Sequence, residues 1–111
     1  MNTFLVLFLA PVSVIEGWMK TDKAEREASE KKMQADWNEW MKQHSSMIKE
    51  TKAAGKTKRV TSKGTADVKN DIMLYSIVEA ESQEAAAKIF ETHPHLGIPE
   101  ASIEVMAIKP L

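Results

Sequence analysis

The chain has 111 residues, with 15 Lys and Arg against 16 Asp and Glu and no cysteine. This is the length of one domain, so a pair of packed domains or a repeat array is excluded, and we take residues 1–111 as a single domain. Without cysteine there is no disulfide framework, thiolate metal site or cysteine nucleophile, and the near-neutral charge gives no general attraction to nucleic acid or acidic lipid.

The first apolar run, Thr3 to Ala10, is predicted to be a β-strand. Its side chains are apolar on both faces: Phe4, Val6 and Phe8 point one way, and Leu5, Leu7 and Leu9 point the other. The run could also be the core of a signal peptide, but no Lys or Arg precedes it and Pro11 interrupts it. It is also shorter than the roughly 20 apolar residues that a bilayer span needs. We therefore favour a strand and expect a cytoplasmic protein with no membrane partner, and the lack of cysteine fits a reducing compartment.

Two helices are predicted after this strand. Ser13 and Glu16 have the spacing of a capping box, which indicates a short helical turn through Met19. A long helix begins at Asp22, and the next glycine, Gly55, is predicted to cap its end. One face of this helix carries an apolar stripe at spacings of three and four, formed by Met33, Trp37, Trp40, Met41, His44, Met47 and Ile48. The rest of its surface is charged, as expected for a solvated face.

Residues 56–62 are rich in Lys, with Val60 as the only large apolar side chain, and are predicted to form a strand at a sheet edge. Residues 63–71 contain Gly, Asn and Asp, which are typical of a turn or loop. The segment Ile72–Ala80 is apolar on both faces and is therefore predicted to be a central strand.

The last part of the chain is predicted to form a helix and a strand. Ser82 is the expected N-cap of the helix, and Pro94 is expected to end it. Residues 95–101 are predicted to be a loop and residues 102–108 the final strand. The resulting order, β-α-β-β-α-β, is that of an α+β protein with the ferredoxin-like arrangement.

This arrangement predicts that the chain forms a homodimer. Right-handed crossovers place both helices on one face of the sheet, yet the predicted strands 3–10, 72–80 and 102–108 are apolar on both faces. An uncovered apolar face of that size exceeds what soluble monomers expose. The sheet of a second copy is the simplest cover. The alternative is that the long helix region or the segment Pro11–Met19 folds over that face.

Four segments in the second half resemble the YCII-related proteins, which belong to the dimeric α+β barrel superfamily. They are Tyr75 to Ser82, Glu84 to Ala86, His93-Pro94 and Ile103 to Val105. The resemblance covers most of the chain in outline and implies a ferredoxin-like protomer whose sheet packs face to face with that of a partner.

The sequence also departs from the YCII-related proteins in two places. Some YCII-related proteins are suspected enzymes with a His–Asp pair between sheet and helices. The Asp-Gly-Pro-Phe motif of one branch is absent, and the corresponding loop is near Thr65 to Val68. The Asp-Pro pair that often closes the second helix is replaced by His93-Pro94. The His–Asp pair is therefore not carried over to this chain.

Five residues are candidates for contact with a ligand in a cleft between sheet and helices: His44, Tyr75, His93, Trp40 and Trp37. A histidine on an apolar stripe is either a packed core residue or a proton carrier at neutral pH. Aromatic side chains with a polar tip either line a half-wet cleft or belong to the core.

Other partners are not predicted. His93 and His95 could offer two imidazoles to a metal, but no third ligand is indicated, so we predict neither a metal nor a cofactor. The basic stretch from Lys52 to Lys63 has no interleaved aromatic residues, and we predict no nucleic-acid partner.

Three hypotheses about function follow. The first is a homodimer that binds a small apolar or aromatic molecule, with turnover left open. The second is a structural or interaction module without a ligand. The third, by analogy of fold alone, is a small monooxygenase-like or isomerase-like enzyme.

Overall fold

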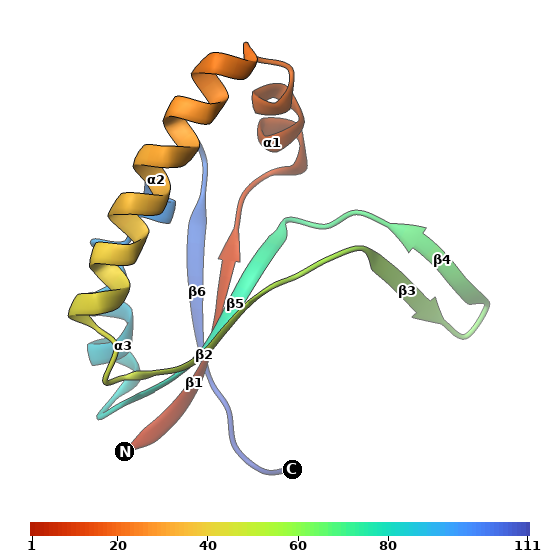
Figure 1. Cartoon of the computed structure of the whole chain (residues 1–111). Coiled ribbons are helices and arrows are strands. Elements are labelled where there is room, and N and C mark those ends of the chain that lie inside the picture. The colour runs from red at the N-terminus through yellow and green to blue at the C-terminus, as the bar shows by residue number, and fades with distance from the viewer.

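The structure is a computed structural model that describes residues 1–111 (Figure 1). Four strands form the main antiparallel sheet, and two form a separate hairpin. The strands are β1 (Asn2–Leu9), β2 (Ile48–Ala53), β3 (Thr57–Thr61), β4 (Gly64–Val68), β5 (Ile72–Ala80) and β6 (Ser102–Ala107). The helices are α1 (Val12–Met19), α2 (Lys23–Gln43) and α3 (Gln83–Phe90), with a 3₁₀ turn, η1, at Pro94–Gly97.

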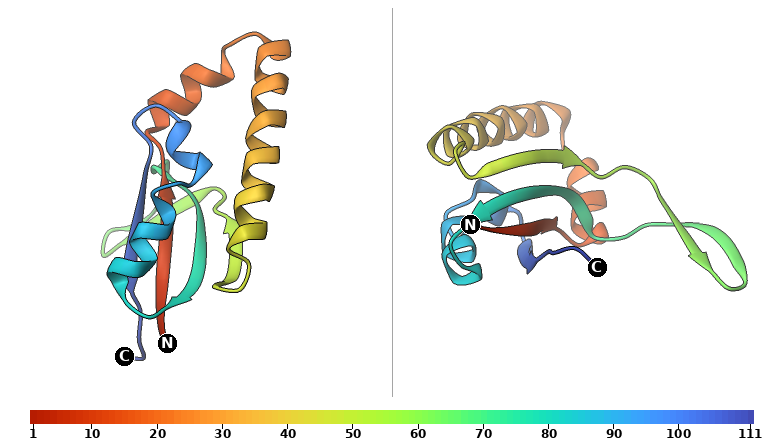
Figure 2. Two further views of the ribbon diagram at one scale, coloured as in Figure 1. Left: turned by 90° about the vertical axis from the view of Figure 1, so that its left-hand side faces the viewer. Right: turned by 90° about the horizontal axis from the view of Figure 1, so that it is seen from below.

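The main sheet has the strand order β2-β5-β1-β6. Strands β1 and β2 are joined through α2 with β5 between them, and β5 and β6 are joined through α3 with β1 between them. These are the two interleaved crossovers of the predicted ferredoxin-like arrangement, so the α+β fold class is confirmed. Helices α2 and α3 lie on the same side of the sheet, as the handedness rule requires (Figures 1 and 2).

The core lies between the sheet and the helices. The period of two along β1 places Phe4, Val6 and Phe8 on the helix side, where each is almost fully buried. In the register of β1 with β5, Phe4 lies opposite Val78 and Val6 opposite Ser76. Helix α3 and the C-terminal part of α2 complete the core with Ala86, Phe90 and Trp40.

The second strand of the main sheet is Ile48–Ala53, which the sequence analysis assigned to the long helix. Helix α2 ends at Gln43, and His44 is its C-cap, so the prediction that Gly55 caps this helix is wrong. Two serines follow His44, and serine favours caps and turns over helix interiors. The apolar stripe of the helix continues through Met47 and Ile48, but residues 48–53 pair with β5 and form an edge strand instead.

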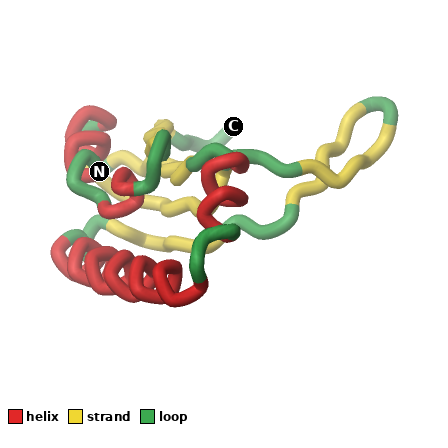
Figure 3. The backbone as a smooth tube through the Cα atoms, turned by 90° about the horizontal axis from the view of Figure 1, so that it is seen from above, coloured by secondary structure: helices red, strands yellow, loops and turns green.

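The Lys-rich segment forms a hairpin instead of an edge of the main sheet. Strands β3 and β4 pair with each other alone and project away from the sheet (Figure 3). The loop predicted for residues 63–71 is therefore wrong over Gly64–Val68. Gly64 has φ 129°, a conformation that favours glycine, and it allows the tight turn between the two strands.

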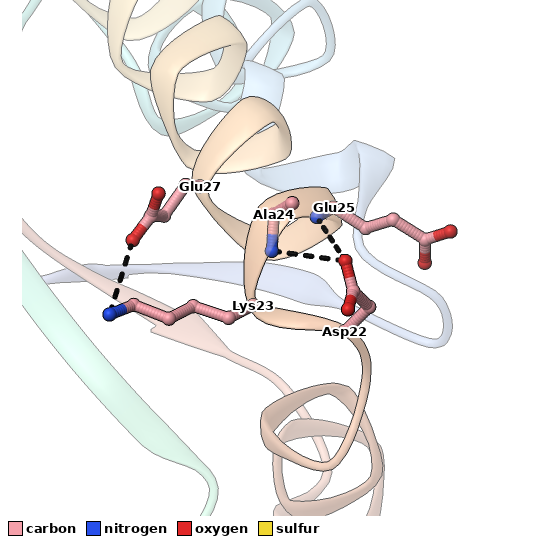
Figure 4. A network of polar contacts seen from close by, with 5 residues as sticks. All are labelled: Asp22, Lys23, Ala24, Glu25 and Glu27. Atoms are coloured by element: carbon pink, nitrogen blue, oxygen red, sulfur yellow. Dashed lines mark hydrogen bonds and ion pairs between the residues drawn. The ribbon is translucent and has the colours of Figure 1, made fainter.

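The helix N-termini follow the predicted capping at α2 and α3 and depart from it at α1. The Asp22 carboxylate accepts hydrogen bonds from the N–H groups of Ala24 and Glu25 at 3.1 and 3.3 Å, next to an exposed Lys23–Glu27 ion pair (Figure 4). Ser82 caps α3 in the same way. The capping box of Ser13 and Glu16 does not form, because Pro11 is the N-cap of α1.

Asp71 caps the N-terminus of α1 in place of the predicted Ser13–Glu16 box. Its side chain accepts a hydrogen bond from the Val12 N–H at 3.2 Å, and its carbonyl accepts one from the Ala10 N–H at 2.9 Å. Helix α3 ends at Phe90, a few residues before Pro94, which opens the 3₁₀ turn.

The second face of the sheet has no cover within the protomer. It carries half-exposed apolar side chains from three strands: Leu5, Leu7, Tyr75, Ile77 and Met106. We call this surface the open face. Helix α2 lies on the opposite side, and α1 lies beyond the strand ends with no buried residue (Figure 1). Neither segment that could have covered this face therefore does so. None of the helices combines the length and apolar composition needed to cross a membrane.

Candidate functional site

A cluster of aromatic and imidazole rings fills the space between β1, the helices and η1. We call it the ring cluster, and its members are Phe8, Trp37, Trp40, His44, Phe90, His93 and His95. It contains four of the five predicted site residues, which come from α2, its C-cap and the segment before η1.

Local sequence patterns bring these rings together. Trp37 and Trp40 are three residues apart on α2, so they share the face that packs on the sheet. His44 is one turn further on, at the end of the helix. The His93-Pro94 sequence keeps His93 extended and turns the chain back into η1, so that its ring points into the core.

His93 lies at the centre of the cluster. Its ring centroid is 4.3 Å from that of Trp37 and 4.4 Å from that of Trp40, and 5.0 Å from that of Phe8. The side chain is 3% exposed. The Trp40 ring is also 4.4 Å from the His44 ring, so His44 is the outer member of this series.

Hydrogen bonds determine which nitrogen of His93 carries the proton. The Nδ1 atom accepts a hydrogen bond from the backbone N–H of His95 at 3.0 Å, so Nδ1 is unprotonated in the neutral ring. The proton therefore lies on Nε2. That atom is buried and has no hydrogen-bond partner. A buried donor without an acceptor costs about 1–3 kcal/mol of stability, which is why such atoms are rare.

His93 is neutral at physiological pH. Burial, together with the neighbouring rings of His95 and His44, lowers the pKa of its imidazole to about 4, since a charged ring is poorly solvated there and nearby imidazolium ions would repel each other. The site therefore presents a neutral N–H donor. It does not present a proton acceptor or a positive charge.

Two further contacts hold the ring of His93 in place. The His95 Nε2 atom donates to the carbonyl of Leu9 at 2.8 Å, which fixes η1 to the end of β1. The Trp40 indole N–H donates to the Thr92 hydroxyl at 3.2 Å, which fixes Trp40 next to the His93 segment. Burial lowers the pKa of His95 as well. These contacts orient His93 from both sides.

A surface pocket of about 320 Å³ adjoins the outer end of the ring cluster. Its walls come from the end of α2, the start of β2, the end of β5 and α3, and its lining includes His44, Met47, Glu79, Glu81 and Ile89. His93 and Trp40 do not line it. Because His44 belongs to both the pocket and the cluster, it is the residue through which the two are in contact.

Tyr75 is separated from the other predicted site residues by the sheet. Ser76 is buried on the helix side, so its neighbour Tyr75 points to the open face. The Tyr75 hydroxyl donates to the Glu50 carboxylate at 3.0 Å, and Lys52 pairs with the same carboxylate at 3.2 Å. The hydrogen bond to Glu50 raises the pKa of Tyr75, and Lys52 lowers the pKa of Glu50.

The sequence analysis did not include Phe8, Phe90, Thr92 or His95 among the candidate ligand contacts. Phe8 and Phe90 were recognisable only as apolar positions of their strand and helix. No group of three or more His, Asp or Glu side chains is placed to hold a metal ion.

No protein-family model matches the sequence, and no curated protein matches it. Among solved structures, the chain is similar to 5-chloro-2-hydroxyhydroquinone dehydrochlorinase (TftG) from Burkholderia phenoliruptrix AC1100, in its complex with 2,5-dihydroxybenzoquinone. The two are 14% identical, and the alignment covers 94% of this chain and 91% of that chain with a TM-score of 0.47. A likeness this weak supports no conclusion about the ligand or activity of this protein. The resemblance to YCII-related proteins stays a prediction.

Proposed function

We propose that the protein binds a small, flat, partly aromatic molecule at the ring cluster, between α2 and the sheet. The observation that carries the proposal is the buried Nε2–H of His93, which has no acceptor within the protein. Buried polar atoms in folded proteins nearly always have a hydrogen-bond partner, and a bound ligand would supply the one that Nε2–H lacks.

The side chains around His93 fit two features of the proposed ligand, its flat aromatic ring and its oxygen atom. The indole rings of Trp37 and Trp40 lie close to His93 and offer flat apolar surfaces, which favour stacking of an aromatic ring. The neutral N–H donor favours a ligand with a carbonyl, phenolic or carboxylate oxygen. Such a donor would also stabilise negative charge that develops on that oxygen, so the same geometry suits turnover.

The packing of α2 suggests how a ligand reaches His93. Trp40 is the only buried residue of the 21-residue helix, and Trp37 is half-buried. The helix is therefore held mainly at its C-terminal end. We propose that a ligand enters through a small displacement of α2, with rotation of the Trp37 and His44 side chains, from the side of the 320 Å³ pocket.

We further propose that the protein is a homodimer joined through the open faces of two sheets. Leu5, Leu7 and Ile77 lie side by side on this face in the register of β1 with β5. A contiguous apolar face on a sheet is typical of a protein–protein interface. In such a dimer Tyr75 lies at the interface, and His44, His93, Trp37 and Trp40 remain the proposed ligand contacts.

A module without a ligand is the second candidate, and one observation favours it. His93 is almost fully buried and does not line the pocket. In that case its N–H faces the π-electrons of a tryptophan ring, a weak interaction that aromatic neighbours can supply.

The first experiment compares the wild type with H93F and with Y75F as a matched control. Each variant removes polar atoms from a ring, but Tyr75 is on the other side of the sheet. Proteins purified without denaturation are examined by native mass spectrometry, and the ¹⁵N signals of labelled histidine are followed while phenol, 4-nitrophenol or benzoate is added.

We expect a bound small molecule, or a shift of the His93 Nε2 signal on addition of a probe, in the wild type and in Y75F. We expect neither in H93F. The absence of any bound mass and of any probe-dependent shift in the wild type would contradict ligand binding and support the module.

A further inference from the structure

The β3–β4 hairpin, which we call the arm, makes almost no contact with its own protomer. Every residue from Lys58 to Asp67 is exposed, and Val60, its large apolar side chain, is 75% exposed. An isolated two-stranded hairpin is at best marginally stable in water. The arm therefore lacks the packing surface that such an element needs.

The base of the arm, in contrast, makes two side-chain contacts. The Asn70 side-chain amide donates to the Thr57 hydroxyl at 3.2 Å, across the two strands. Lys69 pairs with Glu16 of α1 at 2.9 Å. The first contact holds the two strands together at the base, and the second links the base to α1, so both favour the direction in which the arm leaves the sheet.

That direction is toward the side of the open face. In Figure 1 helices α2 and α3 lie to the left of the sheet and the arm lies to the right. In the left view of Figure 2 the two helices are in front of the strands and the arm is behind them. A second sheet that packed on the open face would therefore lie beside the arm.

The arm is strongly basic. Residues 56–69 contain five basic residues and one acidic residue, which gives a net charge of +4 in a chain whose total is −1. Only Lys58 and Lys69 form ion pairs, with Asp67 and Glu16. Lys56, Arg59 and Lys63 have no ionic partner in the protomer.

The opposite edge of the sheet carries the complementary charge. Strand β2 leads into the arm at one edge, and β6 forms the other edge. Residues 81–104, which span α3 and the start of β6, contain five glutamates and one lysine, a net charge of −4. None of these glutamates forms an ion pair in the protomer. Glu104 also points to the open face, since it lies opposite Leu7.

We infer that the arm of each protomer clasps the second copy and places Arg59 and Lys63 against the acidic β6 edge near Glu100 and Glu104. The inference rests on the proposed homodimer. A two-fold axis parallel to the strands brings the β2 edge of one sheet over the β6 edge of the other and repeats every contact, so two arms are engaged at once. The contact gives the hairpin the surface that it lacks and pairs Arg59 and Lys63 with carboxylates that have no ionic partner in the protomer.

A nucleic acid is the other conceivable occupant of a basic arm. The arm has no aromatic residue on which a base could stack. The free glutamates of the β6 edge would also stay unpaired in such a complex. A second copy supplies opposite charges both to the basic arm and to the acidic β6 edge, whereas a nucleic acid supplies them to the arm alone.

The test is a charge-reversal cycle measured by sedimentation equilibrium of the full chain. The variants are R59E/K63E, E100K/E104K and the combination of all four substitutions. The matched control is K31E/K42E, which reverses the same number of exposed charges on α2. A parallel measurement follows wild type and R59E/K63E with a fluorescent single-stranded oligonucleotide.

We expect each double variant to weaken the dimer by roughly tenfold or more, because like charges would face each other across the contact. We expect the combined variant to regain most of the affinity, and the control to behave as the wild type. A wild-type dimer that R59E/K63E weakens no more than the control would overturn the inference while the sheet-face dimer stands. A monomeric wild type would overturn the dimer itself. Oligonucleotide binding that R59E/K63E abolishes, with dimerisation unchanged, would assign the arm to nucleic acid instead.

A second measurement tests proximity directly. The chain has no natural cysteine, so R59C and E104C give proteins with one thiol each. Mixed and oxidised, they are expected to form the R59C–E104C disulfide in preference to R59C paired with a control cysteine, K31C. Equal yields of the two products would contradict the placement of the arm.

Discussion

The backbone N–H of His95 donates to Nδ1 of His93 at 3.0 Å, and this single contact leaves the proton of the neutral imidazole on Nε2. The Pro between the two residues makes the contact possible, because it turns the chain so that His95 N–H faces the ring. The spacing of His93 and His95 thereby orients one N–H donor.

The first prediction concerns the pH dependence of stability. Burial lowers the pKa of His93 from 6.5 to about 4 in the folded protein. Between these values the unfolded chain binds the proton and the folded protein does not, so stability falls as the pH drops from 6.5 toward 4. The loss attributable to His93 is on the order of 3 kcal/mol. Urea unfolding at pH 7 and pH 4 measures it.

The variant H93F isolates this contribution from that of the carboxylates. We expect its stability to fall less between the two pH values than that of the wild type. Labelled histidine in the wild type should show the His93 ring with the proton on Nε2 and without titration between pH 5.5 and 8. Titration of His93 near pH 6.5 would show that its ring is solvated.

The second prediction separates the core from the arm. Phe8 is 1% exposed and contacts the rings of Trp37, Phe90 and His93. F8A should therefore lower the free energy of unfolding by about 3–5 kcal/mol. V60A should change it by less than about 0.5 kcal/mol at concentrations where the protein is monomeric, because Val60 is exposed there. Chemical denaturation measures both, and similar effects would mean that the arm packs on its own protomer.

The sequence predicted those elements whose local signals agree with the global fold. In β5 the apolar pattern, the flanking turn residues and the central position in the sheet all indicate Ile72–Ala80. The caps at Asp22 and Ser82 were predicted for the same reason, since their side chains act on the next turn alone. Such features need no knowledge of distant contacts.

The second strand could not be predicted in this way. The apolar stripe of α2 continues in register through Met47 and Ile48, and no Gly or Pro interrupts it before Gly55. Only the pairing of Ile48 with Val78 and of Thr51 with Ser76 makes this stretch a strand. These contacts join residues far apart in sequence, so the tertiary structure overrides the local pattern.

Part of the candidate site, the residues of α2 and His93, could be predicted from the sequence. Spacing on one helix face identified Trp37, Trp40 and His44 as neighbours, and the sequence placed His93 near a helix end. The position of Tyr75 depends on the register of β5, since a shift of one residue exchanges the two faces of a strand. The bond that sets the tautomer of His93 is a tertiary detail with no sequence signal.

The third prediction concerns a polar pair at the edge of the core. The hydroxyls of Ser76 and Thr51 are 2.7 Å apart across β2 and β5, and Ser76 is 1% exposed. Removal of one hydroxyl leaves the other unpaired, so S76A should cost about 1–2 kcal/mol. The double variant S76A/T51V should cost less than the sum of the single changes. Strict additivity in this double-mutant cycle would mean that the two hydroxyls do not interact.

The fourth prediction tests the open face. Leu5 and Ile77 lie opposite each other at its centre, and both are half-exposed in the protomer. I77K should weaken the proposed dimer at least as strongly as the arm reversal does, because a buried unpaired charge is opposed by desolvation as well as by lost apolar contact. A28K, on an exposed part of α2, is the control.

Circular dichroism should show that the I77K protomer keeps its fold, since Ile77 does not belong to the core between sheet and helices. Sedimentation should then report a monomer at micromolar concentration, while A28K stays dimeric. If I77K and A28K sediment alike as dimers, the two sheets do not meet through this face, and the apolar surface of β1 and β5 must be covered by some other partner.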